Sequence, residues 1–414
     1  MTKMKFLKCG WMKLVPMLLS AAMLTGCSAS ETVADRGNEA GAKGAASTYL
    51  EEAKTDADSQ PKEALAESDG LSIGIAMPEK SLERWNRDGN FLKKQFEAKG
   101  YQVYLTYAED GYEQQIDNIS HLIESKVDLL VVAAVDGNAL SDVLSRAKDA
   151  DIPVISYDRL IMNTDAISYY VSFDNYKVGT LQGQYVVDAL QPETSADGYN
   201  IEFTAGDPMD NNAAFYYNGA YSILAPYIAS GKLRIHSGQD SFAKVSTAGW
   251  STDTAMHRFQ NILRSFYADG TSLDAVVCSN DSTAYGVTQA IASDYTGTNA
   301  VVITGQDGDD ANMKNIVDGK QSMTVFKAVA NEAIVTFYLA DAILNGETPD
   351  EQLIADANWD FNCVYDTKTY DNGTGAIPSY LLEPVTVTKE NMKEILVDTG
   401  YYTTDTEGYL HPIG

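Results

Sequence analysis

The sequence predicts an α/β protein made of two doubly wound lobes, and three observations lead to this prediction. Short apolar runs that are typical of buried strands alternate with amphipathic stretches of helix length. The alternation occurs in two blocks, at residues 71–158 and 201–318. The chain has 414 residues, and the part after residue 70 has the length of two domains rather than one.

Each block supplies strands and helices in alternation. In the first block we expect strands at residues 71–77, 101–107, 128–134 and 153–158, with helices around 85–99, 112–125 and 138–149. In the second block we expect strands at 201–206, 233–238, 275–280 and 301–306, with helices at about 210–229, 249–266, 282–293 and 310–318.

The N-terminus has the pattern of an export signal. A leader with four lysines precedes a short apolar run at residues 14–24, which is too short for a permanent membrane span. The order Leu24-Thr25-Gly26-Cys27 resembles the bacterial lipobox, so we expect a lipoprotein signal peptide at residues 1–26 and a lipid on Cys27. The alternative is an ordinary cleavable signal with an incidental cysteine.

Residues 27–70 are rich in alanine, serine, glycine and acidic residues, which predicts a flexible acidic tether. The chain has a formal charge of −28, which argues against nucleic acid or an anionic membrane face as a partner. We therefore expect membrane attachment only through the N-terminal lipid, on the outer side of the cell membrane or in the periplasm.

The cysteines and histidines predict no metal centre and no disulfide framework. Only Cys278 and Cys363 remain after the signal and the lipidated residue are set aside. A bridge between them is possible, but Cys278 ends an apolar strand, which favours a buried free thiol. Four histidines without ligand spacing argue against a zinc site, and the acidic run 307–312 lacks the glycine and glutamate of a calcium loop.

Polar residues follow many of the predicted strands, and ligands of open α/β sheets lie beyond the carboxyl ends of the strands. Each pair alone could be a helix cap. Together they predict a polar cleft between the lobes, formed by Asp158-Arg159, Asp174-Asn175, Asp207 to Asn212, Asn280-Asp281 and Gln306-Asp307.

An ordered set of motifs resembles the bacterial periplasmic monosaccharide-binding proteins of ABC transporters, in their xylose-binding and multiple-sugar-binding branch. The similarity covers about residues 71–402. The motifs are Ile75-Ala-Met-Pro-Glu-Lys-Ser-Leu-Glu-Arg-Trp85, Ile155-Ser-Tyr-Asp-Arg-Leu160, Val171-Ser-Phe-Asp-Asn-Tyr176, Gly206-Asp-Pro-Met-Asp-Asn-Asn212, Ser279-Asn-Asp281, Gly305-Gln-Asp307, Thr324-Val-Phe-Lys327 and Pro378-Ser-Tyr-Leu-Leu-Glu-Pro-Val385.

The resemblance implies a type I periplasmic-binding-protein fold, with two Rossmann-like lobes joined by three hinge crossings near residues 173–177, 325–329 and 374–380. The N-terminal lobe would comprise residues 71–175 and 328–376, and the C-terminal lobe residues 176–327 and 377–414. The segment 351–372 is longer than the corresponding segment of the family. This insertion could pack on a lobe, contact the permease or lie near the hinge.

The resemblance also implies a closed cleft around one aldopentose or aldohexose. Aromatic rings suit the apolar faces of a pyranose, whereas arginines, carboxylates and amides suit its hydroxyl rim. The expected ligand-binding residues are Lys80, Arg84, Trp85, Asp158, Arg159, Asp210, Asn211, Asn212, Trp250, Asn280, Asp281, Gln306, Asp307 and Lys327. No cofactor is expected.

The predicted function is capture of a monosaccharide and its delivery to the permease of an ABC importer, by a monomer. A chemoreceptor or sensor-kinase partner is the alternative use of the same binding. An enzyme is disfavoured because the sequence has neither a nucleophile elbow nor a P-loop. A transcriptional regulator is disfavoured because a lipobox and an acidic tether occupy the place of its DNA-binding helices.

Overall fold

The computed structural model describes residues 70–78, 80, 83–109 and 111–413. The predicted signal peptide, Cys27 and the tether up to residue 69 lie outside the described residues. Among the described residues, no helix has the length and apolar character that crossing a membrane requires.

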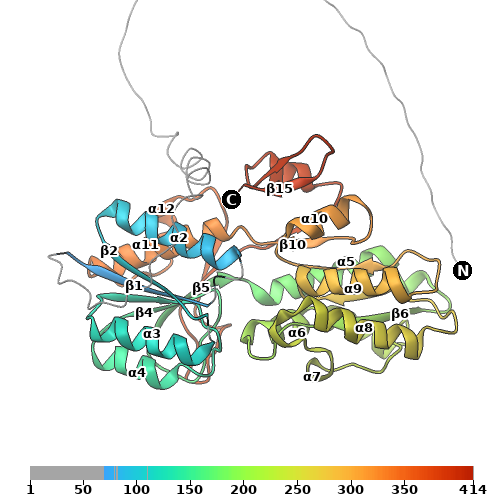
Figure 1. Cartoon of the computed structure of the whole chain (residues 1–414), viewed down its shortest axis with the longest axis horizontal. Helices are drawn as coiled ribbons and strands as arrows, with labels where there is room; N and C mark the ends of the chain where they lie inside the picture. Colours follow the sequence, from blue (N-terminus) through green and yellow to red (C-terminus); the bar gives the residue numbers. More distant parts are fainter. Residues whose placement is uncertain (1–69, 79, 81–82, 110, 414) are drawn as a thin grey trace, which may run out of the picture. The chain divides into compact units, whose positions relative to one another are not determined.

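The first lobe is built on a seven-stranded sheet with the strand order β11-β12-β5-β4-β3-β1-β2 (Figure 1). All neighbouring strands are parallel except β11, which runs antiparallel to β12. The first pass of the chain gives β1 (Ser72–Met77), α2 (Glu83–Lys99), β2 (Gln102–Tyr107), α3 (Tyr112–Glu124), β3 (Leu129–Val132), α4 (Ser141–Asp149), β4 (Val154–Tyr157) and β5 (Ile167–Phe173).

The second lobe is built on a four-stranded parallel sheet with the order β7-β6-β8-β9. Its elements are α5 (Asn175–Leu190), β6 (Tyr199–Thr204), α6 (Asn211–Ala229), β7 (Leu233–Ile235), α7 (Phe242–Val245), α8 (Thr252–Phe266), β8 (Ala275–Cys278), α9 (Asp281–Asp294), β9 (Val302–Ile303), α10 (Asp310–Val317) and β10 (Thr324–Phe326). Two short 3₁₀ turns lie at Pro192–Thr194 and Ala248–Trp250.

The chain then returns to the first lobe with α11 (Val329–Leu344), α12 (Gln352–Ala357), β11 (Cys363–Asp366) and β12 (Ser379–Leu382). It ends on the second lobe with β13 (Val385–Val387), a π-helical turn at Lys393–Val397, and the antiparallel pair β14 (Tyr402–Thr404) and β15 (Leu410–Pro412). Strand β13 pairs with β10, so two passages between the lobes run side by side.

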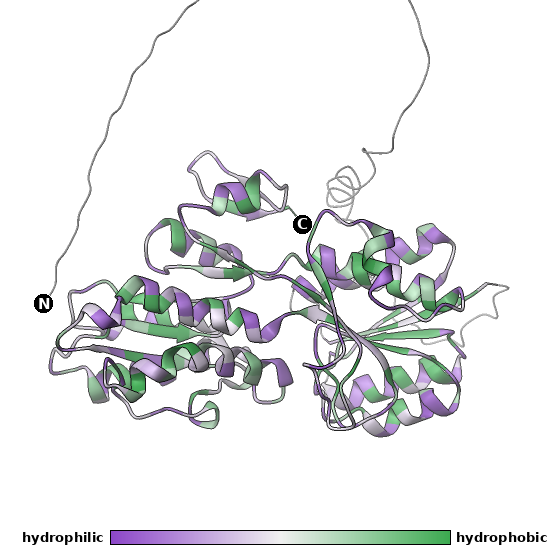
Figure 2. Ribbon diagram, turned by 180° about the vertical axis from the view of Figure 1, so that it is seen from behind, coloured by the Kyte–Doolittle hydropathy of each residue, from purple (hydrophilic) through white to green (hydrophobic). Residues whose placement is uncertain are grey.

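Helices cover both faces of each sheet, so strand residues on both faces are buried and are mostly apolar. The first sheet has α3 and α4 on one face and α2 and α11 on the other, and the second sheet lies between the pair α5 and α6 and the pair α8 and α9. Figure 2 shows the hydrophobic strands at the centre of each lobe and polar residues on the outer helix surfaces. Both Cys278, which is buried, and Cys363 are free thiols.

One predicted boundary is wrong. The crossing expected near 374–380, with a C-terminal lobe from residue 377, does not occur there, because β12 is hydrogen-bonded to β5 in the first sheet. The chain leaves the first lobe only after Leu382. The insertion at 351–372 forms α12 and the edge strand β11, and its rings of Trp359 and Phe361 stack 5.4 Å apart against the core of the first lobe.

Candidate functional site

The candidate site is formed by residues that follow the carboxyl ends of strands in both lobes. This is the edge at which doubly wound sheets bind ligands. Asp158 and Arg159 follow β4, Asp210 to Asn212 follow β6, Asn280 and Asp281 follow β8, Asp307 follows β9, Lys327 follows β10, and Arg84 and Trp85 lie in the first turn of α2.

Asp158 lies in a strained turn that its neighbours hold in place. Its φ is +58°, a left-handed conformation that costs energy for a residue with a side chain. Its carbonyl oxygen accepts three hydrogen bonds, from the hydroxyls of Tyr170 at 2.7 Å and Ser172 at 2.9 Å and from Nδ2 of Asn212 at 2.7 Å. Since Asn212 belongs to the second lobe, this turn also joins the two lobes.

The Asp158 carboxylate pairs with the Arg84 guanidinium, which two further carboxylates also contact. Arg84 Nη2 lies 2.5 Å from Asp158 Oδ2 and 3.3 Å from Glu332 Oε2, and its Nε lies 3.4 Å from Asp88 Oδ2. The three acidic side chains are at most 5% exposed. Arg84 is therefore held by carboxylates from α2, from the loop after β4 and from α11.

Negative charge exceeds positive charge around Arg84, and the pKa values of the carboxyl groups shift in different directions. Burial, with the nearby Asp158, raises the pKa of Glu332 well above its usual range, and burial also raises the pKa of Asp88. Burial opposes ionisation of Asp158 too, but attraction by Arg84 and Lys327 lowers its pKa below the usual value. The cluster therefore favours the ionised form of Asp158 and the protonated form of Glu332.

Replacing Glu332 with glutamine is expected to stabilise the protein increasingly as pH rises. Folding raises the pKa of this carboxyl group, so its protonated form stabilises the folded protein fully below the unfolded-state pKa of about 4.3. This stabilisation is lost as pH rises toward the pKa in the folded state. The difference in melting temperature, variant minus wild type, should grow by about 2–4 °C between pH 4 and pH 8. Glu347→Gln, at an exposed position, is the control; a constant Glu332→Gln difference would contradict the assignment.

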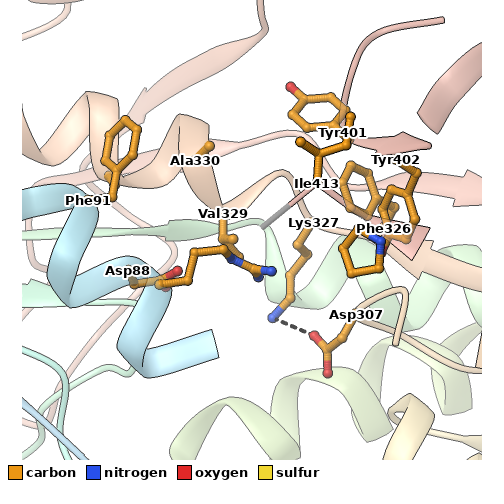
Figure 3. A pocket seen from close by; sticks show the side chains of 13 residues that line it. Asp88, Phe91, Asp307, Phe326, Lys327, Val329, Ala330, Tyr401, Tyr402 and Ile413 are labelled. Carbon is orange, nitrogen blue, oxygen red and sulfur yellow. Dashed lines mark ion pairs between the residues drawn. The ribbon is translucent and has the colours of Figure 1, made fainter. Parts of the chain in front are cut away.

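Lys327 connects carboxylates of the two lobes at the second hinge crossing. Its Nζ lies 3.4 Å from Asp307 Oδ1 and 4.0 Å from Asp158 Oδ2, and its side chain is 3% exposed. Figure 3 shows this lysine pointing toward Asp307. The ammonium also lies 5.8 Å from the ring centroids of Phe173 and Tyr216. A buried cation between two acidic groups fixes the positions of both.

A second set of contacts joins the lobes on the other side of Asp158. Arg159 Nε lies 3.5 Å from Asp210 Oδ2, while its Nη1 donates to the carbonyl oxygen of Ala134 at 3.0 Å. Asn211 Nδ2 donates to the carbonyl oxygen of Leu160 at 3.2 Å. The N-terminus of α6 is therefore tied to the loop after β4.

The two tryptophans have different surroundings. The Trp85 side chain is buried, and the guanidinium groups of Arg84 and Arg159 lie 4.7 and 5.2 Å from its ring centroid. This arrangement makes Trp85 a support for both arginines rather than an open stacking surface. Trp250 lies in a 3₁₀ turn, not in the predicted helix, and its ring covers Gly206 so closely that a Cβ there would lie 1.8 Å from it.

Asp281, which the sequence predicts as a sugar contact, lies in the interior of the second lobe. The side chain is fully buried, and both carboxylate oxygens are occupied by groups of the second lobe. The donors are the backbone N–H groups of Gly308 and Asp309 at 2.9 and 3.0 Å, Gln321 Nε2 at 2.9 Å and Thr324 Oγ1 at 3.0 Å. Asp281 instead holds the loop that carries Asp307.

Three other residues predicted as sugar contacts, Asn280, Gln306 and Lys80, have different surroundings. Asn280 Oδ1 caps α9 by accepting from the backbone N–H of Thr283 at 3.0 Å. Gln306 is buried, and among the described residues its Oε1 has no hydrogen-bond partner. The Lys80 ammonium lies 5.2 Å from the ring centroid of Tyr107.

Sequence reasoning missed Asp88 and Glu332. Asp88 stands four residues after Arg84, and an i, i+4 pair of opposite charges on a helix is a signal that could have found it. Glu332 lies in the first turn of α11 and reaches Arg84 only through the fold. No local pattern marks it.

The chain matches the family model described as a periplasmic binding protein domain over residues 73–348. It is 45% identical over 338 residues to the multiple sugar-binding periplasmic protein SbpA of Azospirillum brasilense, covering 81% of this chain and 90% of that protein. It is 36% identical over 342 residues to the D-xylose-binding periplasmic protein of Haemophilus influenzae, covering 82% of this chain and 93% of that protein.

Solved structures show the same similarity. An ABC transporter solute-binding protein from Clostridium phytofermentans with bound β-D-glucose is 50% identical, with a TM-score of 0.74, and the match covers 80% of this chain and 98% of that one. A carbohydrate transporter solute-binding protein from Chloroflexus aurantiacus in complex with D-glucose is 31% identical, with a TM-score of 0.70, covering 81% and 98%.

Proposed function

Because this chain belongs to the periplasmic binding protein family, we propose that it binds a single aldopyranose between its lobes and delivers the sugar to an ABC importer. The predicted family, fold class and general function are confirmed by this membership. The sugar itself is our proposal: glucose and xylose are the first candidates, because they are the ligands of the glucose-bound relative and of the xylose-binding relatives.

The observation that best supports this proposal is the set of polar groups shared between the lobes. Arg84, Asp158, Lys327 and Asp307 form a chain of charged acceptors and donors that runs from the first lobe to the second. A pyranose has hydroxyls that both donate and accept, so one sugar can satisfy groups from both lobes. Binding to both would favour the closed arrangement of the lobes.

The proposed ligand contacts are Arg84, Asp158, Arg159, Asp210, Asn211, Trp250, Asn280, Gln306, Asp307 and Lys327. Trp85, Asn212 and Asp281 act in this proposal through the residues they hold. We further propose that the protein acts as a monomer without catalytic activity. We also propose that a lipid on Cys27 anchors it, so it should be found in the membrane fraction of cells that export it.

A thermal unfolding panel on the whole chain tests the sugar proposal. The ligands are glucose, xylose, galactose, arabinose, ribose and fructose, with a disaccharide as the control. A ligand present at 1,000 times its Kd stabilises the native state by about 4 kcal/mol, which corresponds to roughly 8–16 °C for a protein of this size. We expect such a shift with glucose or xylose. A panel without any shift would contradict the aldopyranose assignment.

A further inference from the structure

The C-terminal strands β14 and β15 form a hairpin that packs on the second lobe. Its side chains Tyr402 and Leu410 join an apolar cluster with Met313 and Ile316 of α10. Polar contacts add to this packing: His411 Nδ1 lies 2.8 Å from Asp310 Oδ1, and the Tyr409 hydroxyl donates to Asp318 Oδ1 at 3.2 Å. The hairpin is therefore fixed to the helix that follows the Asp307 loop.

The hairpin also closes one side of a cavity next to the candidate sugar site. This cavity has about 560 Å³ of empty space, part of it open to solvent, and lies between α2, the start of α11 and the hairpin. Figure 3 shows Tyr401, Tyr402 and Ile413 on one side and Asp88 and Phe91 on the other, with Lys327 between them and Asp307 below Lys327. Two proposed sugar contacts thus lie on the cavity wall.

Tyr402 contacts the loop that presents Asp307. Its buried hydroxyl donates to the carbonyl oxygen of Gly308, the residue after Asp307. Both loop residues have positive φ values, +105° for Asp307 and +80° for Gly308. Left-handed backbone at a non-glycine residue persists only where the surroundings hold it.

Three anchors hold this loop. The backbone N–H of Asp307 donates to the carbonyl oxygen of Val325 at 3.0 Å, and Asp281 accepts from the next two N–H groups. Tyr402 supplies the third anchor, which holds the carbonyl oxygen of Gly308. It comes from a part of the chain far from the other two.

We propose that the C-terminal hairpin is a working part of the ligand site, in which Tyr402 positions Asp307 for the sugar. The inference rests on the proposed function, since it requires Asp307 to contact the sugar. Without the hydroxyl of Tyr402, Gly308 loses a hydrogen bond and the strained Asp307 gains freedom to turn away from Lys327. Ligand binding must then order the loop again, which lowers affinity.

The test is Tyr402→Phe, which removes one oxygen and keeps the ring against Phe326. We expect the Kd of the best sugar, measured by titration calorimetry, to rise roughly five- to tenfold, the effect of about one hydrogen bond. The matched control is Tyr409→Phe, which removes the hairpin hydroxyl that contacts Asp318 instead of the loop. Its Kd should stay within about twofold.

A double-mutant cycle separates positioning from general weakening of the fold. In an Asp307→Ala background, Tyr402→Phe should change the Kd by less than about twofold, because the residue that it positions is gone. The inference would be overturned if Tyr402→Phe raised the Kd equally with and without Asp307→Ala, or if Tyr402→Phe alone left the Kd unchanged. In either case the sugar binding of the wild-type protein would still stand. A wild-type protein that binds no sugar would overturn the proposed function and this inference together.

Discussion

Replacing Arg84 with alanine is expected to abolish measurable sugar binding and to lower the free energy of unfolding by about 3–5 kcal/mol. The guanidinium contacts Asp88, Asp158 and Glu332, and none of these is more than 5% exposed. Its removal leaves a buried ionised Asp158 without its nearest cation. Titration calorimetry and urea unfolding at pH 7 measure the two effects separately.

Two variants sharpen this prediction. Arg84→Lys keeps the positive charge but lacks the planar fork that reaches several carboxylates at once, so it should recover much of the stability and little of the affinity. Arg146→Ala removes an exposed arginine of the same lobe, which lies 3.2 Å from Glu124, and should cost less than about 1 kcal/mol. Sugar binding by Arg84→Ala within tenfold of the wild type would refute the proposed role.

The second large effect is expected for Asp281→Ala, in the second lobe. This change removes the shared acceptor of four buried groups, namely the backbone N–H groups of Gly308 and Asp309 and the side chains of Gln321 and Thr324. Of these, Gln321 Nε2 keeps a second acceptor, the carbonyl oxygen of Met323. We expect a loss of about 3–5 kcal/mol in the free energy of unfolding. Affinity should fall as well, because the loop that carries Asp307 loses two of its hydrogen bonds.

Asp281→Asn should rescue little of this loss. Both oxygens of Asp281 accept hydrogen bonds, so an amide in either orientation places an NH₂ group against donors. The matched control is Asp253→Ala, which removes an exposed first-turn aspartate from α8 and should cost less than about 1 kcal/mol. Chemical denaturation measures the free energy of unfolding of the three variants. A loss below about 1 kcal/mol in this free energy for Asp281→Ala would contradict the prediction.

The local pattern of the sequence predicts most of the fold but not every pairing. Strands β3 and β8 are continuous apolar runs with every residue buried, and such runs are what parallel sheets covered on both faces require. The lobe to which Ser379–Leu382 belongs depends instead on its pairing with β5, far away in the sequence. No periodicity within the strand carries that information.

The candidate site shows the same division between local and distant information. Strand-end positions correctly indicate that Asp158, Asp307 and Lys327 meet, because the topology of parallel sheets brings strand ends together. Asp281 accepts hydrogen bonds from the side chains of Gln321 and Thr324, and no regular sequence spacing relates these two residues to Asp281. Whether a carboxylate faces a ligand or the protein interior thus depends on donors that only the folded chain supplies.

The position of β12 between β5 and β11 has a consequence for biogenesis. The first lobe cannot complete its sheet until residues 379–382 have been synthesised, because they fill the place between an early strand and the edge strand. Pairings between such distant segments form slowly. The N-terminal half of the chain therefore cannot form a finished first lobe by itself, and this lobe becomes complete only when nearly the whole polypeptide is present.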